Sequence, residues 1–148
     1  MNIEMFIYIG IVIYSIILHE IAHGYAALLC GDTTAKRAGR LTLNPGPHID
    51  PIGSVALPLM AVLSGFGVFG WAKPVPIDPG YLTTKAKEVF VSVAGIATNL
   101  ALCFIFLILI KSNFLSVYNS LFIKIAVVNL GLGLFNLIPI PPFDGMHI

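Results

Sequence analysis

The chain has 148 residues, of which 57% are hydrophobic and 10% charged, and its formal net charge is +1. A soluble domain carries about 25% charged residues, so this composition excludes an ordinary soluble domain and indicates a protein of the lipid bilayer. The small net charge provides no basic stripe for nucleic acid, and we expect no nucleic-acid partner.

Four apolar stretches follow one another along the chain, at residues 5–29, 52–72, 89–110 and 121–140. A helix needs about 20 residues to cross a bilayer, so each stretch is long enough. The pattern predicts an all-α polytopic membrane protein with about three to four transmembrane helices, multi-pass in the cell membrane. Because there is no internal repeat, we expect a single membrane-embedded domain over residues 1–148.

The first stretch contains His19-Glu20-Ile21-Ala22-His23, the spacing H-E-x-x-H. Positions i and i+4 share a face of a helix, so the two imidazoles can bind one metal ion with Glu20 beside it. A charged residue at the centre of a membrane helix costs roughly 2.5 to 3.5 kcal/mol on insertion scales, so a solvated surface cluster is a poor explanation. A satisfied polar cluster that joins helices is the alternative left open.

The connection between the first two stretches holds Thr-Leu alternation at residues 41–43, followed by the turn sequence Asn44-Pro45-Gly46-Pro47. Such a pattern predicts a short β-hairpin or an extended edge strand.

The second stretch, residues 52–72, contains four glycines and a proline, which weaken helices, and we expect it to re-enter the membrane rather than cross it. The first and fourth stretches then run parallel, which brings His19, His23 and Asp144 to similar depth. Re-entry also places Lys111 alone on one side of the membrane. Six cations then lie on the other side, a bias typical of a cytoplasmic face: Lys36, Arg37, Arg40, Lys73, Lys85 and Lys87.

A catalytic zinc site has three protein ligands and an open position for water, and the motif supplies two ligands. The candidates for the third are His48, Asp50, Asp78, Asp144 and His147. The first three lie in loops, where a solvated group or turn former is the simpler explanation. Asp144 follows a proline-broken helix, where freed carbonyls and the next glycine allow close approach. We therefore favour Asp144, with His147 as a competitor or an exposed terminal residue.

One Zn²⁺ per chain, held by two histidines and one carboxylate, would lower the pKa of a bound water toward about 7. Glu20 would then be the general base. It would take the proton of the water during attack on a peptide carbonyl and pass it to the leaving nitrogen.

The motif at His19 to His23, taken with the run from Asn136 to Gly145, resembles the paired signatures H-E-x-x-H and N-x-x-P-x-P-x-x-D-G of the site-2 protease family of intramembrane zinc metalloproteases. Residues 70–76 are similar to a loop of its short prokaryotic branch. The resemblance implies that His19, His23 and Asp144 bind zinc, that Glu20 is catalytic, and that Asn136 binds the substrate backbone or the oxyanion.

Two departures from the family pattern affect the expectations. Where relatives show G-P-x-x-N, this chain has Gly95-Ile96-Ala97-Thr98-Asn99 without the proline. Asn99 is expected either to bind a substrate strand or to join helices. Relatives also usually continue with further hydrophobic helices, whereas this sequence ends four residues after Asp144, so a C-terminally short domain is expected.

The expected function is hydrolysis of peptide bonds in or near transmembrane segments of membrane proteins. A helical substrate must unwind before it can be cut, and the predicted hairpin or the second stretch is expected to pair with it by β-addition. The alternatives are a catalytically inactive or truncated family member, and a membrane metal-binding transporter or sensor, which usually spreads its ligands over several helices. No feature predicts the oligomeric state.

Overall fold

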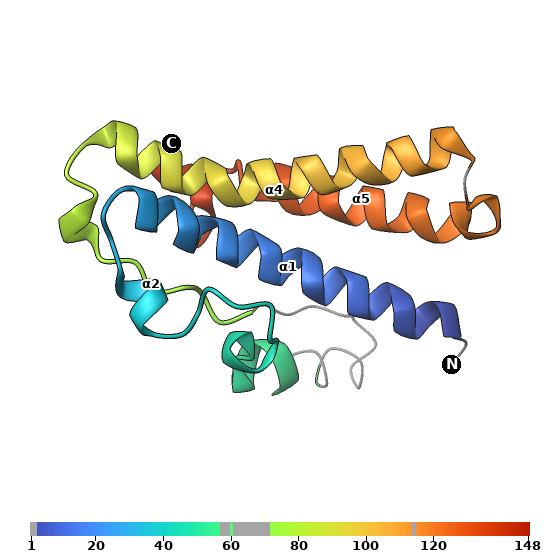
Figure 1. Cartoon of the computed structure of the whole chain (residues 1–148), viewed down its shortest axis with the longest axis horizontal. Helices are drawn as coiled ribbons and strands as arrows, with labels where there is room; N and C mark the ends of the chain where they lie inside the picture. Colours follow the sequence, from blue (N-terminus) through green and yellow to red (C-terminus); the bar gives the residue numbers. More distant parts are fainter. Residues whose placement is uncertain (1–2, 57–59, 61–71, 114) are drawn as a thin grey trace.

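The computed structural model describes residues 3–56, 60, 72–113 and 115–148, and three long helices dominate this part of the chain (Figure 1). They are α1 (Ile3–Leu29), α4 (Lys85–Ser112) and α5 (Asn119–Phe135). The remaining elements are single turns: α2 (Thr34–Arg37), η1 (Gly46–His48), η2 (Pro51–Ala56), η3 (Pro79–Tyr81), η4 (Ser116–Tyr118) and η5 (Asp144–His147).

Among the described residues, three helices are long and apolar enough to cross a membrane: Phe6–Leu29, Lys85–Ser112 and Ser116–Phe135. Large apolar side chains such as Phe104 and Val127 are 64% and 62% exposed, as expected of surfaces that face lipid. The prediction of an all-α protein with about three to four transmembrane helices is confirmed in part, because the described residues are all-helical and contain three helices of that length. Most of residues 52–72 lies outside the described residues, so re-entry of that stretch stays a prediction.

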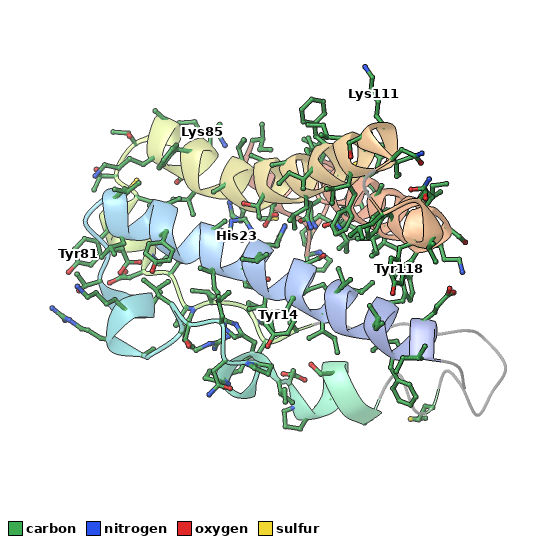
Figure 2. All side chains as sticks on the ribbon, turned by 45° about the vertical axis from the view of Figure 1, so that its right-hand side comes forward. Tyr14, His23, Tyr81, Lys85, Lys111 and Tyr118 are labelled. Carbon is green, nitrogen blue, oxygen red and sulfur yellow. The ribbon has the colours of Figure 1, made fainter. Side chains whose placement is uncertain are left out.

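The three long helices lie side by side, with α1 and α5 running in one direction and α4 in the other (Figure 1). The end of α1, the start of α4 and the segment after α5 therefore meet at the same end of the bundle. Lys85 and Lys111 mark opposite ends of α4 (Figure 2). Lys124, near the start of α5, adds a second cation to the end where Lys111 lies.

The predicted β-hairpin is wrong, because the described residues contain no strand and residues 41–43 form bends. Local side-chain hydrogen bonds replace the strand ladder there. The N–H of Asn44 donates to Oγ1 of Thr42, the N–H of Gly46 donates to Oδ1 of Asn44, and the ring of His48 contacts the Thr42 carbonyl at 2.9 Å. Short polar side chains that bond to nearby backbone in this way favour turns over strands.

An extended segment at residues 72–78 lies along α1 and is held there by contacts from two directions. Gly24 lets it approach, since a Cβ at this position would lie 3.0 Å from the Val75 side chain. The guanidinium of Arg40 donates to the Lys73 carbonyl at 2.6 Å. The packing of this segment against α1 places Val75 beside the H-E-x-x-H motif.

Asp32, in the turn after α1, anchors the far end of the same segment. Its carboxylate is buried and accepts the backbone N–H groups of Thr34 and Asp78, both at 2.8 Å. Burial by itself raises the pKa of the Asp32 carboxyl, but hydrogen bonds from Thr34 and Asp78 and the charge of Arg37 outweigh it, and the pKa lies below its ordinary value of 3.8.

Candidate metal centre

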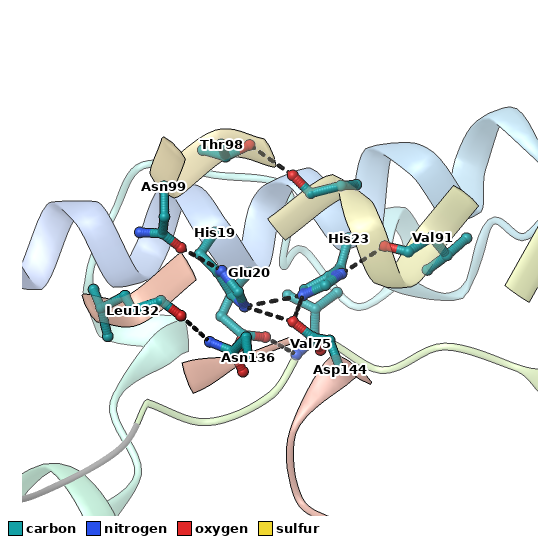
Figure 3. Close-up of polar contacts among 11 residues, drawn as sticks. His19, Glu20, His23, Val75, Val91, Thr98, Asn99, Leu132, Asn136 and Asp144 are labelled. Carbon is teal, nitrogen blue, oxygen red and sulfur yellow. Dashed lines mark hydrogen bonds and ion pairs between the residues drawn. The ribbon is translucent and has the colours of Figure 1, made fainter. Parts of the chain in front are cut away.

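Two histidines of α1 and one carboxylate from beyond α5 converge on a single point (Figure 3). Nε2 of His19 and Nε2 of His23 lie 3.0 Å apart, and Oδ2 of Asp144 lies 3.2 Å and 3.1 Å from them. Both histidines are buried. Of the His, Cys, Asp and Glu side chains in the described part of the chain, these three form the group that could hold a metal ion.

The other ring nitrogen of each histidine is engaged by an acceptor. Nδ1 of His23 lies 2.8 Å from the Val91 carbonyl, and Nδ1 of His19 lies 2.6 Å from Oδ1 of Asn99. A carbonyl oxygen can only accept, so each Nδ1 carries a hydrogen, and in the neutral imidazole each Nε2 then presents a lone pair to the centre. This is the tautomer in which a neutral imidazole binds a metal through Nε2.

The residues fit a zinc ion on two grounds. First, Oδ2 of Asp144 is buried and has no hydrogen-bond donor among the described residues, so three electron-pair donors face one another and need a cation between them. Second, zinc bonds of 2.0–2.2 Å in a tetrahedral site imply ligand separations of about 3.3 Å. The observed separations of 3.0 to 3.2 Å are close to that value.

Asp144 reaches the histidines because the chain turns back after α5. The helix ends at Phe135, and the prolines at positions 139, 141 and 142 prevent it from continuing. The N–H of Gly145 then donates to the Asn136 carbonyl at 2.6 Å. A Cβ at Gly145 would overlap the Leu137 carbonyl, so only glycine permits the turn that places Asp144 at the centre.

Gly95 on α4 forms the opposite wall of the centre. A Cβ at this position would overlap Nε2 of His23 and lie 2.6 Å from Cε1 of His19. The absent side chain therefore leaves the space in which both imidazoles sit.

Glu20 lies beside the centre but is held by a different element. Its Oε2 accepts the backbone N–H of Val75, from the extended segment, at 2.8 Å. A cavity of about 380 Å³ adjoins both Glu20 and the centre. It extends toward Leu82, Glu88 and His147, at the end of the bundle where α4 begins.

The two asparagines predicted as substrate-binding residues occupy different places. Asn136 is half-buried, lines the cavity, and donates through Nδ2 to the Leu132 carbonyl of its own helix. Asn99 is fully buried behind His19, with Oδ1 on that imidazole and Nδ2 donating to Oδ1 of Asn129 at 3.1 Å.

Three of the other candidates for the third ligand are engaged elsewhere. The ring of His48 contacts a loop carbonyl, Asp50 accepts from the backbone at the start of η2, and Asp78 accepts the N–H of Gly80 in η3. His147 lines the cavity and is exposed.

Sequence reasoning missed three contributors to the centre: Gly95, Val75 and Asn129. The run similar to G-P-x-x-N contains Gly95 but does not indicate that this glycine leaves space for the two imidazoles. No local pattern marks a backbone N–H, such as that of Val75, as a partner of a distant carboxylate. Asn129, a polar residue inside an apolar stretch, was the one available signal.

Comparisons with known proteins give relatives over most of the chain. It is 40% identical to "Putative zinc metalloprotease YwhC" of Bacillus subtilis, over 92% of this chain and 64% of that protein. It is 34% identical to "Putative zinc metalloprotease Rip2" of Mycobacterium tuberculosis and 33% identical to that of Mycolicibacterium smegmatis, each over 88% of this chain and 51% of the relative. The chain thus spans about half to two thirds of the length of these relatives.

This chain is a homologue of bacterial proteins named as zinc metalloproteases. The matches are consistent with a site-2 protease-like family and confirm the resemblance drawn from the two motifs. The relatives carry zinc metalloprotease names, and the described part of this chain contains three helices of membrane-spanning length. No family model and no solved structure matches the chain.

Proposed function

We propose that this homologue is an intramembrane zinc metalloprotease of the site-2 type, which hydrolyses peptide bonds in or near transmembrane segments of membrane proteins. One observation carries the proposal. Nε2 of His19, Nε2 of His23 and Oδ2 of Asp144 lie within 3.2 Å of one another, beside Glu20, and both histidines belong to a helix long and apolar enough to span the bilayer.

His19, His23 and Asp144 would hold one Zn²⁺, and Glu20 would handle the proton. Zinc, when bound, supplies a Lewis acid that polarises the scissile carbonyl and activates water. Glu20 has one carboxylate oxygen fixed by Val75, which leaves Oε1 to take the proton of the water and pass it to the leaving nitrogen.

The cavity gives water and an unwound peptide a path to the centre. Pro74, Val75 and Ile77 of the extended segment line one wall, and Asn136 lines another near Asp144. We assign Asn136 to the substrate backbone or the oxyanion. Asn99 does not line the cavity and is assigned instead to the orientation of His19.

The test is proteolysis in liposomes with a model single-span substrate, comparing the wild type, Glu20→Gln and Glu4→Gln. Glu4 is an exposed carboxylate in the first turn of the same helix, so its variant controls for the charge change. We expect Glu20→Gln to bind zinc and cleave nothing, while Glu4→Gln cleaves like the wild type.

Two outcomes would overturn the proposal. Cleavage by Glu20→Gln at the wild-type rate would remove Glu20 from the mechanism. Zinc flux across the liposome membrane by a wild-type chain that cleaves no substrate would support a transporter instead.

A further inference from the structure

A line of polar side chains runs through the interior of the helix bundle, away from the cavity. It consists of Ser15 on α1, Asn129 on α5 and Asn99 on α4, and it ends at His19. Asn99 and Asn129 are fully buried, and Ser15 is 2% exposed. Polar groups at this depth are costly unless they are hydrogen-bonded, and each of these side chains has partners.

The direction of every hydrogen bond in this line is fixed by backbone carbonyls beside it, because the carbonyls of Ile11 and Ile125 can only accept. Oγ of Ser15 lies 2.9 Å from the Ile11 carbonyl and donates to it. Nδ2 of Asn129 donates to the Ile125 carbonyl at 3.0 Å and to Oγ of Ser15 at 3.1 Å.

These bonds leave Asn129 only one way to face Asn99. With both hydrogens of its amide in use, Asn129 presents Oδ1, which accepts Nδ2 of Asn99 at 3.1 Å. Asn99 must then turn Oδ1 toward His19, and Nδ1 of His19 must donate to it. The hydrogen sits on Nδ1, and Nε2 is left with its lone pair toward Asp144.

The two histidines differ in how this tautomer is set. The acceptor for His23 is the Val91 backbone carbonyl, which can only accept a hydrogen bond and never donate one. The acceptor for His19 is a side-chain amide, and a flipped Asn99 would present a donor to Nδ1. The orientation of that amide therefore has to come from elsewhere.

We propose that Asn129 is a positioning residue for metal binding, which fixes the amide of Asn99 and, through it, the tautomer of His19. The proposal rests on the proposed function, because it takes the histidines and Asp144 as zinc ligands. Asn129 does not touch the metal or the substrate, and its effect is to make Nε2 of His19 available as a ligand.

A purely structural role for Asn129 makes a different prediction, and a change at Asn99 separates the two. In Asn99→Asp the carboxylate has two acceptor oxygens, so either orientation accepts from His19, as in the common carboxylate–histidine–zinc arrangement. An orientation set by Asn129 is then no longer needed. If Asn129 only joins helices, its loss remains as harmful as before.

The experiment measures zinc affinity by competition with a chromophoric chelator, together with the visible spectrum of the Co²⁺-substituted chain. The variants are Asn129→Leu, Asn99→Asp and the double variant, with Ser15→Ala as control. Loss of outer hydrogen-bond partners typically weakens metal binding 10–100-fold. We expect Asn129→Leu to lose about tenfold or more and to change the Co²⁺ spectrum. Ser15→Ala should stay near wild type, because the Ile125 carbonyl still orients Asn129.

The double variant decides the result. We expect its zinc affinity to lie within about threefold of Asn99→Asp alone, since the carboxylate makes Asn129 dispensable. The proposal is overturned if Asn129→Leu binds zinc like the wild type. It is also overturned if Asn129→Leu lowers the zinc affinity by the same factor in the Asn99→Asp background as in the wild type.

If Asn129→Leu does not fold, Asn129→Asp tests the proposal instead, because its carboxylate still offers an acceptor to Nδ2 of Asn99. It should retain zinc affinity near the wild-type value, and a tenfold loss in a folded Asn129→Asp chain would contradict the proposal. A wild-type chain that binds no zinc would instead contradict the proposed function, so the two failures are distinguishable.

Discussion

The backbone N–H of Val75 donates a 2.8 Å hydrogen bond to Oε2 of Glu20, across 55 residues of sequence. Its neighbours in the extended segment, Pro74 and Pro76, have no N–H to donate. Val75 is buried against α1 where Gly24 admits it. One oxygen of the proposed general base is therefore fixed by a backbone N–H, which only a substitution by proline removes.

Val75→Pro removes this donor while keeping an extended backbone. A hydrogen bond to a charged group contributes about 1.5 to 3 kcal/mol, so we expect at least a tenfold lower kcat, with zinc content unchanged. Val75→Ala is the matched control, because it shortens the side chain and keeps the N–H. Equal rates for the proline and alanine variants, measured on the model substrate, would show that Val75 does not orient Glu20.

Gly95→Ala should abolish metal binding, because its Cβ would occupy the space of the His23 ring and lie 2.6 Å from Cε1 of His19. Alanine is the better helix former by roughly 1 kcal/mol, so the helix itself should persist. Gly131→Ala on α5 is the control, since no atom lies within 4 Å of a Cβ built there. Stoichiometric zinc in the purified Gly95→Ala chain would contradict this account of the centre.

The sequence predicts the part of the candidate centre whose geometry is set by local spacing. The i, i+4 spacing of His19 and His23 on one helix face requires no knowledge of the rest of the fold. The position of Asp144 after a proline-broken helix favours it as the third ligand, and the structure brings it to the two histidines because α1 and α5 run parallel.

The parts that sequence reasoning missed depend on contacts between distant segments. Gly95 and Asn129 act through helix packing, which no single-segment periodicity encodes. The hairpin prediction failed at Thr42 and Asn44, where side-chain hydrogen bonds to the local backbone favour a turn. Alternating threonine and leucine residues form a strand only where a second strand is available to pair with them.

Asp32 should stabilise the fold in a pH-dependent way, since its carboxylate ties the turn after α1 to the extended segment. Its pKa is lowered in the folded chain. The contribution to the free energy of unfolding is therefore complete above the ordinary value of 3.8 and is lost as the pH falls through the lower folded value.

Asp32→Asn replaces one acceptor oxygen by a donor, which should cost about 1 to 3 kcal/mol at neutral pH. Asp78→Asn is the control, because its Oδ1 can still accept from Gly80. Melting temperatures of the wild type and Asp32→Asn in detergent, from pH 7 to pH 3, should differ most at neutral pH and converge on acidification. A difference that stays constant across this range would remove the carboxylate from the explanation.

Zinc should raise the melting temperature of the chain, because its proposed ligands lie on α1 and in the segment after α5 and come together only in the folded state. A ligand present at a hundred times its Kd stabilises the folded state by about 2.7 kcal/mol. We expect the shift in the wild type and in Asp50→Ala, whose carboxylate accepts backbone N–H groups at η2, and little shift in Asp144→Ala. Without Asp144, only the two imidazoles of α1 remain as ligands, and zinc bound to them alone does not link α1 to the segment after α5. An equal shift in Asp144→Ala would therefore mean that the zinc responsible binds elsewhere.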